Sequence, residues 1–113
     1  MQELDYDHLL AINTIGHKHE VNNSIHYHPY EPTPYSALVE LFKHYDILES
    51  DHLVDFGCGK GRLNFFIHHY YQSFVTGIEM NKRFYEEAIQ NKHHYINTYK
   101  IPEKSIQFYC TLA

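Results

Sequence analysis

The chain has 113 residues and a formal net charge of −5 at pH 7, and its hydrophobic content of 43% is ordinary for a globular protein. This length corresponds to one small domain or to part of a larger one. The nine Lys and Arg residues are not clustered, which argues against bulk attraction to nucleic acid, and no apolar run is long enough to cross a membrane. Two widely separated cysteines and an acidic start, "MQELDYDHLL", favour a reduced, cytoplasmic setting over a secreted one.

Residues 1–32 show no sustained hydrophobic period, so we expect an irregular segment in which "YDHLLAI" begins a short helix. The pairs His17/His19 and His26/His28 have the spacing that puts two imidazoles on one side of a strand, where they can share a metal ion. Histidines occur throughout this chain, however, and we predict no metal site. The stretch "HYHPYEPTPY" is a candidate lid over a ligand site.

A helix is predicted to start at "TPYSALVELFKHY", because Thr33 can cap it and Pro34 suits the first helical position. Its expected buried stripe follows the i, i+3, i+4, i+7 spacing and comprises Leu38, Leu41, Phe42 and Tyr45.

The rest of the chain alternates strand-like and helix-like patterns. The expected elements are a strand at His52–Phe56, a helix from about Lys60 to Tyr71, a strand at Ser73–Glu79, a helix from Asn81 to about Tyr99, and a strand at Ser105–Cys110. The first of these helices is expected to bury Leu63, Phe66, Ile67 and Tyr70, and the second Phe84, Tyr85, Ala88 and Ile89. This order predicts an α/β fold with a three-stranded, parallel, Rossmann-like sheet, flanking helices and a preceding N-terminal helix.

The stretch "LVDFGCGKGRL" places Gly57, Gly59 and Gly61 between the first strand and its helix. Such a loop lets the backbone approach a ligand, and with the helix N-terminus it is expected to form an anion-receptive shelf. Glu79 closes the second strand, where its two oxygens can accept both hydroxyls of a ribose. A dinucleotide fingerprint is excluded because Arg62 stands where the third glycine is needed, and a phosphate P-loop is excluded because Gly61 follows Lys60.

"LVDFGCGKGRL" followed by "VTGIEMN" resembles the class I S-adenosylmethionine-dependent methyltransferases, in detail over about residues 51–88. The resemblance implies that Asp55 holds the glycine loop and the methionine amino group, that Glu79 binds the ribose hydroxyls and that Met80 packs on the adenine. The glycines would line the methionine and ribose portion. The predicted set for binding S-adenosylmethionine is Asp55, Gly57, Cys58, Gly59, Gly61, Glu79 and Met80.

The family fold has about seven strands, of which only three can be read in this sequence. We therefore expect residues 33–113 to be the cofactor-binding half of a methyltransferase domain, a fragment that is inactive alone. Its methyl acceptor is not indicated and remains open among nucleic acid, protein and small molecules, and no catalytic residue is assigned. The alternative is a non-catalytic nucleotide-binding or interaction module built on half a Rossmann sheet. An uncovered first strand would also favour a homodimer or aggregation through that sheet edge, unless part of residues 1–32 covers it.

Three residues near the glycines have two interpretations each. Lys60 and Arg62 can steer an anionic substrate, but solvated side chains in a first helical turn are the favoured interpretation. Cys58 can be a reactive thiol near a helix N-terminus, but a small buried side chain in a tight loop is favoured.

Overall fold

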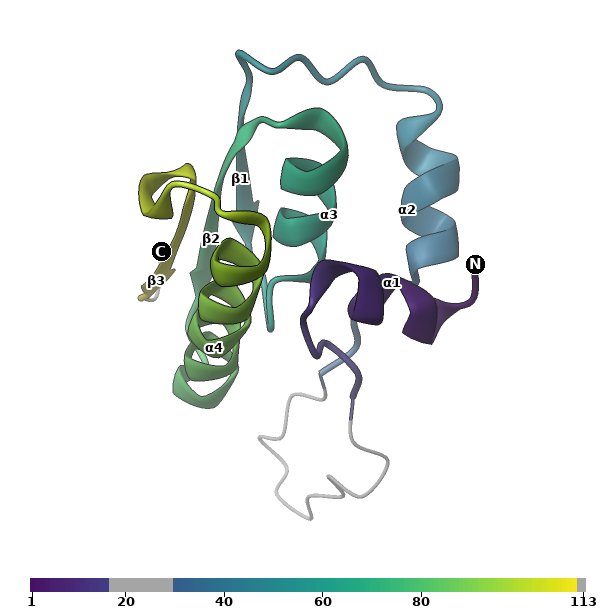
Figure 1. Cartoon of the computed structure of the whole chain (residues 1–113). Helices are drawn as coiled ribbons and strands as arrows, with labels where there is room; N and C mark the ends of the chain where they lie inside the picture. The colour runs from purple at the N-terminus through teal and green to yellow at the C-terminus, as the bar shows by residue number, and fades with distance from the viewer. Residues whose placement is uncertain (17–29, 112–113) are drawn as a thin grey trace.

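A computed structural model describes residues 1–16 and 30–111 of the chain (Figure 1). Helices and strands alternate from α2 onward, as expected. The elements are α1 (Glu3–Leu10), α2 (Tyr35–Phe42), β1 (His52–Phe56), α3 (Arg62–Tyr71), β2 (Phe74–Glu79), α4 (Lys82–Tyr99), the 3-10 helix η1 (Glu103–Ser105) and β3 (Ile106–Cys110).

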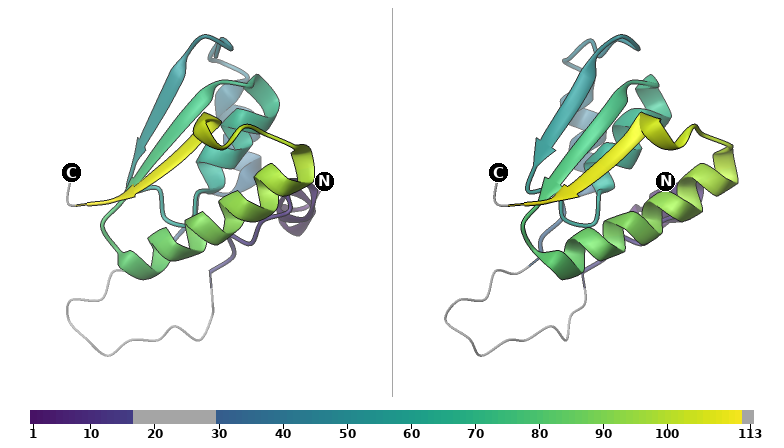
Figure 2. Two further views of the ribbon diagram at one scale, coloured as in Figure 1. Left: turned by 60° about the vertical axis from the view of Figure 1, so that its left-hand side comes forward. Right: turned by 90° about the vertical axis from the view of Figure 1, so that its left-hand side faces the viewer.

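The three described strands form one parallel sheet in the order β1-β2-β3. In the register of the sheet Asp55 lies opposite Gly77, and Gly77 lies opposite Phe108. The strands run in one direction, so the loops that follow β1 and β2 both leave the sheet at the carboxyl ends of the strands (Figure 2). The α/β, Rossmann-like fold class is thereby confirmed, and the carboxyl ends of the strands are where open α/β sheets bind ligands.

Helices cover one face of the sheet among the described residues. Buried Val75 and Phe108 belong to this covered face, whereas Val54 (47% exposed), Phe74 (46%) and Tyr109 (53%) belong to the other. In the right-hand view of Figure 2 the strands lie in front of α2 and α3, with the uncovered face toward the viewer. β1 is also an edge strand of the described sheet. Parallel sheets normally bury both faces, so this exposure is unusual.

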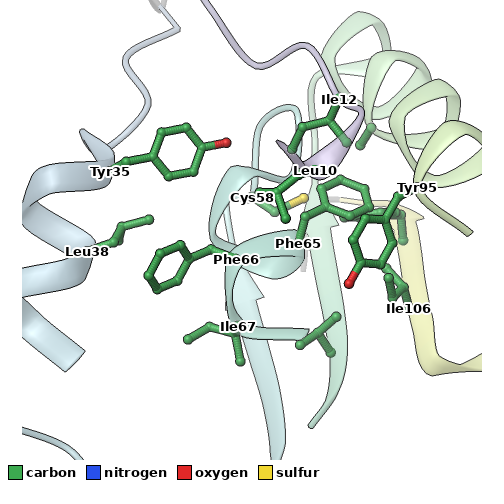
Figure 3. Packing of buried hydrophobic residues seen from close by; sticks show 13 residues of the cluster. Leu10, Ile12, Tyr35, Leu38, Cys58, Phe65, Phe66, Ile67, Tyr95 and Ile106 are labelled. Carbon is green, nitrogen blue, oxygen red and sulfur yellow. The ribbon is translucent and has the colours of Figure 1, made fainter. Parts of the chain in front are cut away.

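The core has two parts, separated by α3 (Figure 3). Between α2 and α3, Tyr35 and Leu38 pack near Phe66, whose ring centroid is 6.3 Å from that of Tyr35. Between α3 and the sheet, Phe65 packs on Tyr95 and Phe108 with centroid distances of 5.3 and 5.6 Å. α3 is therefore buried on two sides, which explains why Phe65, outside the single predicted stripe, is fully buried. Tyr70, which was predicted to be buried, is 45% exposed.

The predicted stripe of α2 is wrong at two positions. α2 begins at Tyr35, with Pro34 as its N-cap, and it ends at Phe42. Leu41 is 47% exposed and Tyr45, beyond the helix end, is 60% exposed. α2 has only eight residues and buries Tyr35 and Leu38, so it ends before Tyr45 and cannot carry the whole predicted stripe, which spans about two turns.

The N-terminal segment is more regular than expected, because α1 is a complete helix that packs on α2 and α3. The pairs His17/His19 and His26/His28 lie outside the described residues. Within residues 1–16 and 30–111, no group of three His, Cys, Asp or Glu side chains is arranged to hold a metal ion. No described helix is both long and apolar enough to cross a membrane.

Candidate functional site

A cavity of about 660 Å³ lies where β1 and β2 end. The residues around it come from the segment before α2, from α2 itself, from the ends of β1 and β2, from the glycine loop and α3, and from the start of α4 and the turn before it. They are Tyr30, Glu31, Pro32, Thr33, Leu38, Asp55, Gly57, Cys58, Gly59, Arg62, Leu63, Glu79, Met80, Asn81 and Phe84.

The glycine loop is held mainly by hydrogen bonds to β2. The N–H groups of Gly57 and Cys58 both donate to the carbonyl of Ile78, at 2.7 and 3.1 Å. The Gly59 N–H donates to Glu79 Oε1 at 2.8 Å, and the Gly61 N–H donates to the Cys58 carbonyl at 3.0 Å. Four amides of the predicted anion-receptive shelf are therefore used inside the protein. The expectation of such a shelf is wrong for these amides, because β2 accepts three of them and the loop itself accepts the fourth.

Two of the glycines show why the loop needs this residue type. Gly57 has φ +76°, and a Cβ there would meet nothing within 4 Å, so its backbone borders open space beside the cavity. Gly59 has φ +58°, and a Cβ there would lie 2.7 Å from Cε1 of Tyr30. Both angles are in the left-handed region that other residues enter only with strain. At Gly59 a side chain would additionally displace the Tyr30 ring.

Glu79 has two roles, of which the sequence indicated one. Its carboxylate is 8% exposed and accepts the Gly59 N–H through Oε1 and the Asn81 N–H through Oε2, both at 2.8 Å. Glu79, rather than Asp55, therefore holds the glycine loop among the described residues. Each carboxylate oxygen has a second lone pair, so Glu79 can still accept hydrogen bonds from a ligand.

Asp55 lines the cavity, and none of the described residues donates a hydrogen bond to its carboxylate. Burial, with a smaller contribution from the negative charge of Glu79, raises the pKa of Asp55 to about 6. When a carboxyl group is partly desolvated next to a second carboxylate, a cation placed near both of them stabilises its ionised form. Both acidic groups therefore favour a positively charged ligand in this cavity.

Cys58 is buried, as the favoured interpretation predicted. Burial, followed by the charges of Asp55 and Glu79, raises the pKa of its thiol to about 12. The thiol is consequently protonated at neutral pH, and a nucleophilic thiolate is disfavoured there.

The prediction that Lys60 and Arg62 are solvated is wrong. Lys60 is 1% exposed and Arg62 is 8% exposed, and both cations are bonded inside the protein. Nζ of Lys60 donates to the carbonyl of Ile15 at 2.9 Å, and Nε of Arg62 donates to Oγ1 of Thr14 at 2.8 Å. The N-terminal residues that contact the loop use these charges, so neither side chain is available to steer an anionic substrate.

Six of the seven residues that the sequence indicated as a binding set do border this one cavity. Gly61 does not: a Cβ there would lie 2.8 Å from Phe65 and 2.9 Å from Phe108, so it faces the core. Met80 borders the cavity and is 60% exposed.

The sequence interpretation missed several cavity residues, chiefly Phe84, Leu38 and Asn81. Phe84 and Leu38 follow ordinary helical periods and were expected only in the core. Asn81 was expected as a helix cap, and it does accept the Phe84 N–H at 3.1 Å. Tyr30 and its three successors belong to the stretch proposed as a lid, and that proline-containing stretch before a helix was the only available signal for them.

No protein-family model and no curated protein sequence matches this chain. Solved structures do match it. An RNA methyltransferase from Salinibacter ruber in complex with S-adenosyl-L-homocysteine matches with a TM-score of 0.60 and 22% identity, over 72% of this chain and 50% of the other. Geranyl diphosphate C-methyltransferase from Streptomyces coelicolor A3(2) matches with a TM-score of 0.59 and 15% identity, over 96% and 42%. The YjhP protein from E. coli matches with a TM-score of 0.57 and 17% identity, over 83% and 33%.

The chain thus has a class I methyltransferase-like fold. It spans half or less of the length of these three neighbours. At identities of 22% and below, the likeness concerns the fold, and the chemistry of the site must be argued from its own residues.

Proposed function

We propose that the chain binds S-adenosylmethionine in the cavity at the ends of β1 and β2, and that it is the cofactor-binding portion of a methyltransferase. The observation that carries this proposal is the acidic character of a cavity beside a glycine loop. Asp55 and Glu79 border it together, and the N–H groups of Gly57, Cys58, Gly59 and Gly61 are already bonded inside the protein. A ligand with sulfonium and ammonium charges suits this site better than a phosphorylated nucleotide does.

The cavity residues fit the parts of that ligand. The remaining lone pairs of Glu79 would accept the ribose hydroxyls, and Asp55, which has no donor among the described residues, would accept from the ammonium group. Open space beside Gly57 leaves room for close approach of the ligand to the backbone. Met80 and Phe84 would supply apolar contact for the adenine. A neighbour with this fold was crystallised with S-adenosyl-L-homocysteine, which supports the assignment.

When bound, the cofactor supplies a methyl group activated by its positive sulfur. The part of the described residues is to bind and orient it, since methyl transfer depends chiefly on alignment of the acceptor with that methyl. The proposal names no catalytic residue. The methyl acceptor stays open among nucleic acid, protein and small molecules.

Calorimetric titration with S-adenosylhomocysteine and with S-adenosylmethionine tests the proposal. Glu79→Gln retains an acceptor for the Gly59 N–H but removes the charge, and we expect it to weaken binding about tenfold or more, because a hydrogen bond to a charged group contributes about 1.5–3 kcal/mol. Glu86→Gln is the matched control, because Glu86 lies on the surface of α4 with a side chain 60% exposed. A parent chain that binds neither compound would contradict the proposal, as would equal affinities for the parent and Glu79→Gln.

A further inference from the structure

The two buried cations that follow the loop glycines connect the loop to the N-terminal arm, which we define as residues 1–16. Lys60 donates to the carbonyl of Ile15, and its Nζ also lies 4.6 Å from the centroid of the Tyr30 ring. Its nearest carboxylate is that of Glu87, at 3.8 Å. A buried ammonium group needs such partners, so detaching the arm would leave Lys60 poorly satisfied.

Arg62 makes a second and more extensive connection. Its Nε donates to Thr14 Oγ1 at 2.8 Å, and two further N–H groups donate to the carbonyls of Thr14 and Thr33 at 3.4 and 3.2 Å. Thr14 is in turn held by buried Asp7, which accepts from both its N–H and its hydroxyl. One guanidinium group thus joins the arm, the segment before α2 and the start of α3.

Asn91 of α4 makes the third connection. Its Nδ2 donates to the carbonyls of Asn13 and Lys60, both at 3.0 Å, and its Oδ1 accepts the Asn13 N–H at 2.9 Å. The arm and the glycine loop therefore share one amide side chain. The loop cannot change its conformation at Lys60 without disturbing the bonds that hold the arm.

Tyr30 is the cavity residue that depends on these connections. Its hydroxyl donates to the carbonyl of Thr14 at 2.7 Å, and its ring lies 5.1 Å from that of Phe84. The ring also covers Gly59 so closely that a methyl group there would lie 2.7 Å from it. Because Tyr30 borders the cavity, the docked arm supports one wall of the ligand site.

We propose that Tyr30 is a positioning residue of the cofactor site, held across Gly59 by the docked N-terminal arm, and that arm docking and cofactor binding stabilise each other. This inference rests on the proposed function for the identity of the ligand. The loop that contacts the ligand also holds the arm through Lys60 and Arg62, so the two events are coupled. Docking of the arm must then strengthen ligand binding by the same free energy by which the ligand stabilises docking. The arm is thereby part of the site and not a separate extension.

Substitutions at Tyr30 test the wall directly. Tyr30→Phe keeps the ring but loses the bond to Thr14 that ties it to the arm, so we expect its affinity for S-adenosylhomocysteine to fall about threefold to fivefold, between the parent and Tyr30→Ala. Tyr30→Ala removes the wall, and we expect a loss of at least tenfold. Tyr45→Ala, at a tyrosine that is 60% exposed and borders no part of the cavity, is the control and should bind as the parent does. Parent-like affinity in Tyr30→Ala would overturn the inference.

Amide hydrogen exchange of residues 11–16 tests the coupling. The Thr14 N–H is bonded within the arm to Asp7 at 2.7 Å, and the Asn13 N–H is bonded across to Asn91. We expect S-adenosylhomocysteine to slow exchange of this peptide, and Arg62→Gln to accelerate it without ligand and to weaken binding at least tenfold. Thermal unfolding checks that Arg62→Gln is folded. Exchange that neither ligand nor substitution alters would overturn the coupling.

The two proposals fail in different ways. A parent chain that binds no S-adenosylhomocysteine would contradict the proposed function, while faster exchange of residues 11–16 in ligand-free Arg62→Gln would still support anchoring of the arm. Tight binding that is lost in Glu79→Gln but unchanged in Tyr30→Ala would support the proposed function and overturn the role of Tyr30.

Discussion

The two carboxylates at the ends of β1 and β2 differ in how their charges are satisfied. Glu79 accepts the backbone N–H groups of Gly59 and Asn81. Asp55 has no donor among the described residues, and burial beside Glu79 raises its pKa to about 6. Asp55 is therefore the group whose charge state changes just below neutral pH and is the more sensitive to a cationic ligand.

Binding of S-adenosylmethionine should consequently depend on pH through Asp55. If only the ionised carboxylate accepts the ammonium group, a pKa of about 6 leaves about a tenth of the chains competent at pH 5, so affinity should be about tenfold lower there than above pH 7. The ligand's own α-amino group, whose ordinary pKa is about 7.7–8.0, is mostly protonated over this range. Calorimetry between pH 5 and 7.5 should show this slope in the parent and none in Asp55→Asn. An equally steep slope in Asp55→Asn would assign the titration to another group.

The raised pKa of Asp55 makes ligand affinity rise with pH but makes the stability of the ligand-free chain fall with pH. A folded-state pKa above the ordinary 3.8 means that the folded state binds more protons between about pH 4 and 6, so this group lowers the free energy of unfolding as pH rises through that window. Asp55→Asn should therefore unfold at a higher temperature than the parent at pH 7.5, with little difference at pH 4. Calorimetric melting at both pH values measures the contrast.

At the scale of elements, α1 provides the cap that α2 lacks in its own sequence. The predicted cap at Thr33 is not formed, because α2 starts at Tyr35 and has no side-chain cap from its own N-cap residue. Instead Oε1 and Oε2 of Glu3 accept the N–H groups of Tyr35 and Ser36, at 2.6 and 3.2 Å. A carboxylate at this end of a helix also interacts favourably with the helix dipole. Both effects join α1 to α2 independently of their apolar contact.

Glu3→Ala should therefore destabilise the whole chain by about 1 kcal/mol, the usual contribution of a helix cap, and lower Tm by about 4–8 °C. Glu40→Ala is the matched control, because Glu40 is 67% exposed and its ion pair is with exposed Lys43 at the end of the same helix. Such surface pairs contribute little, so this variant should melt within about 2 °C of the parent. Thermal unfolding followed by circular dichroism measures both, and equal melting of the two variants would contradict the capping role.

At the scale of the whole molecule, the sheet is the feature left without a partner. Its described part has helices on one face, and β1 lies at its edge with Val54 and Phe56 47% and 69% exposed. An apolar edge strand with unpaired backbone groups invites pairing with another chain. The described N-terminal residues do not add a strand beside β1, since they form α1 and a segment that packs on α3 and the glycine loop.

We accordingly expect this chain to self-associate through β1. Sedimentation velocity between about 5 and 200 μM should show the sedimentation coefficient rising with concentration, because edge pairing is a bimolecular reaction. Val54→Lys places a charge on the edge and should keep the chain monomeric over this range. Leu41→Lys is the control, since Leu41 is a similarly exposed apolar residue on α2, at 47%. A parent chain that stays a compact monomer at 200 μM would show the prediction to be wrong.

What the sequence determined by itself follows from local physics. Hydrophobic periods, turn residues and caps act over a few neighbours, so the alternation of strands and helices, the Asn81 cap and the glycine loop were all predictable from the printed residues. The acid at the end of β2 was predictable too, because parallel strands bring Glu79 to the carboxyl end of the sheet, where the glycine loop lies. Together with the resemblance to class I methyltransferases, these features indicated six of the residues that border the cavity.

The tertiary structure decided everything that depends on which distant segments meet. Lys60 and Arg62 read as solvated charges because nothing near them in sequence indicates Ile15 or Thr14, which satisfy them. Phe65 is buried because α3 packs between α2 and the sheet, and one helical stripe cannot express two buried faces. Tyr30 reaches Gly59 only because the arm folds back onto the loop. A helical period indicates one buried face, as at Ile67 and Ala88, but contacts between segments that are distant in the sequence are properties of the assembled chain.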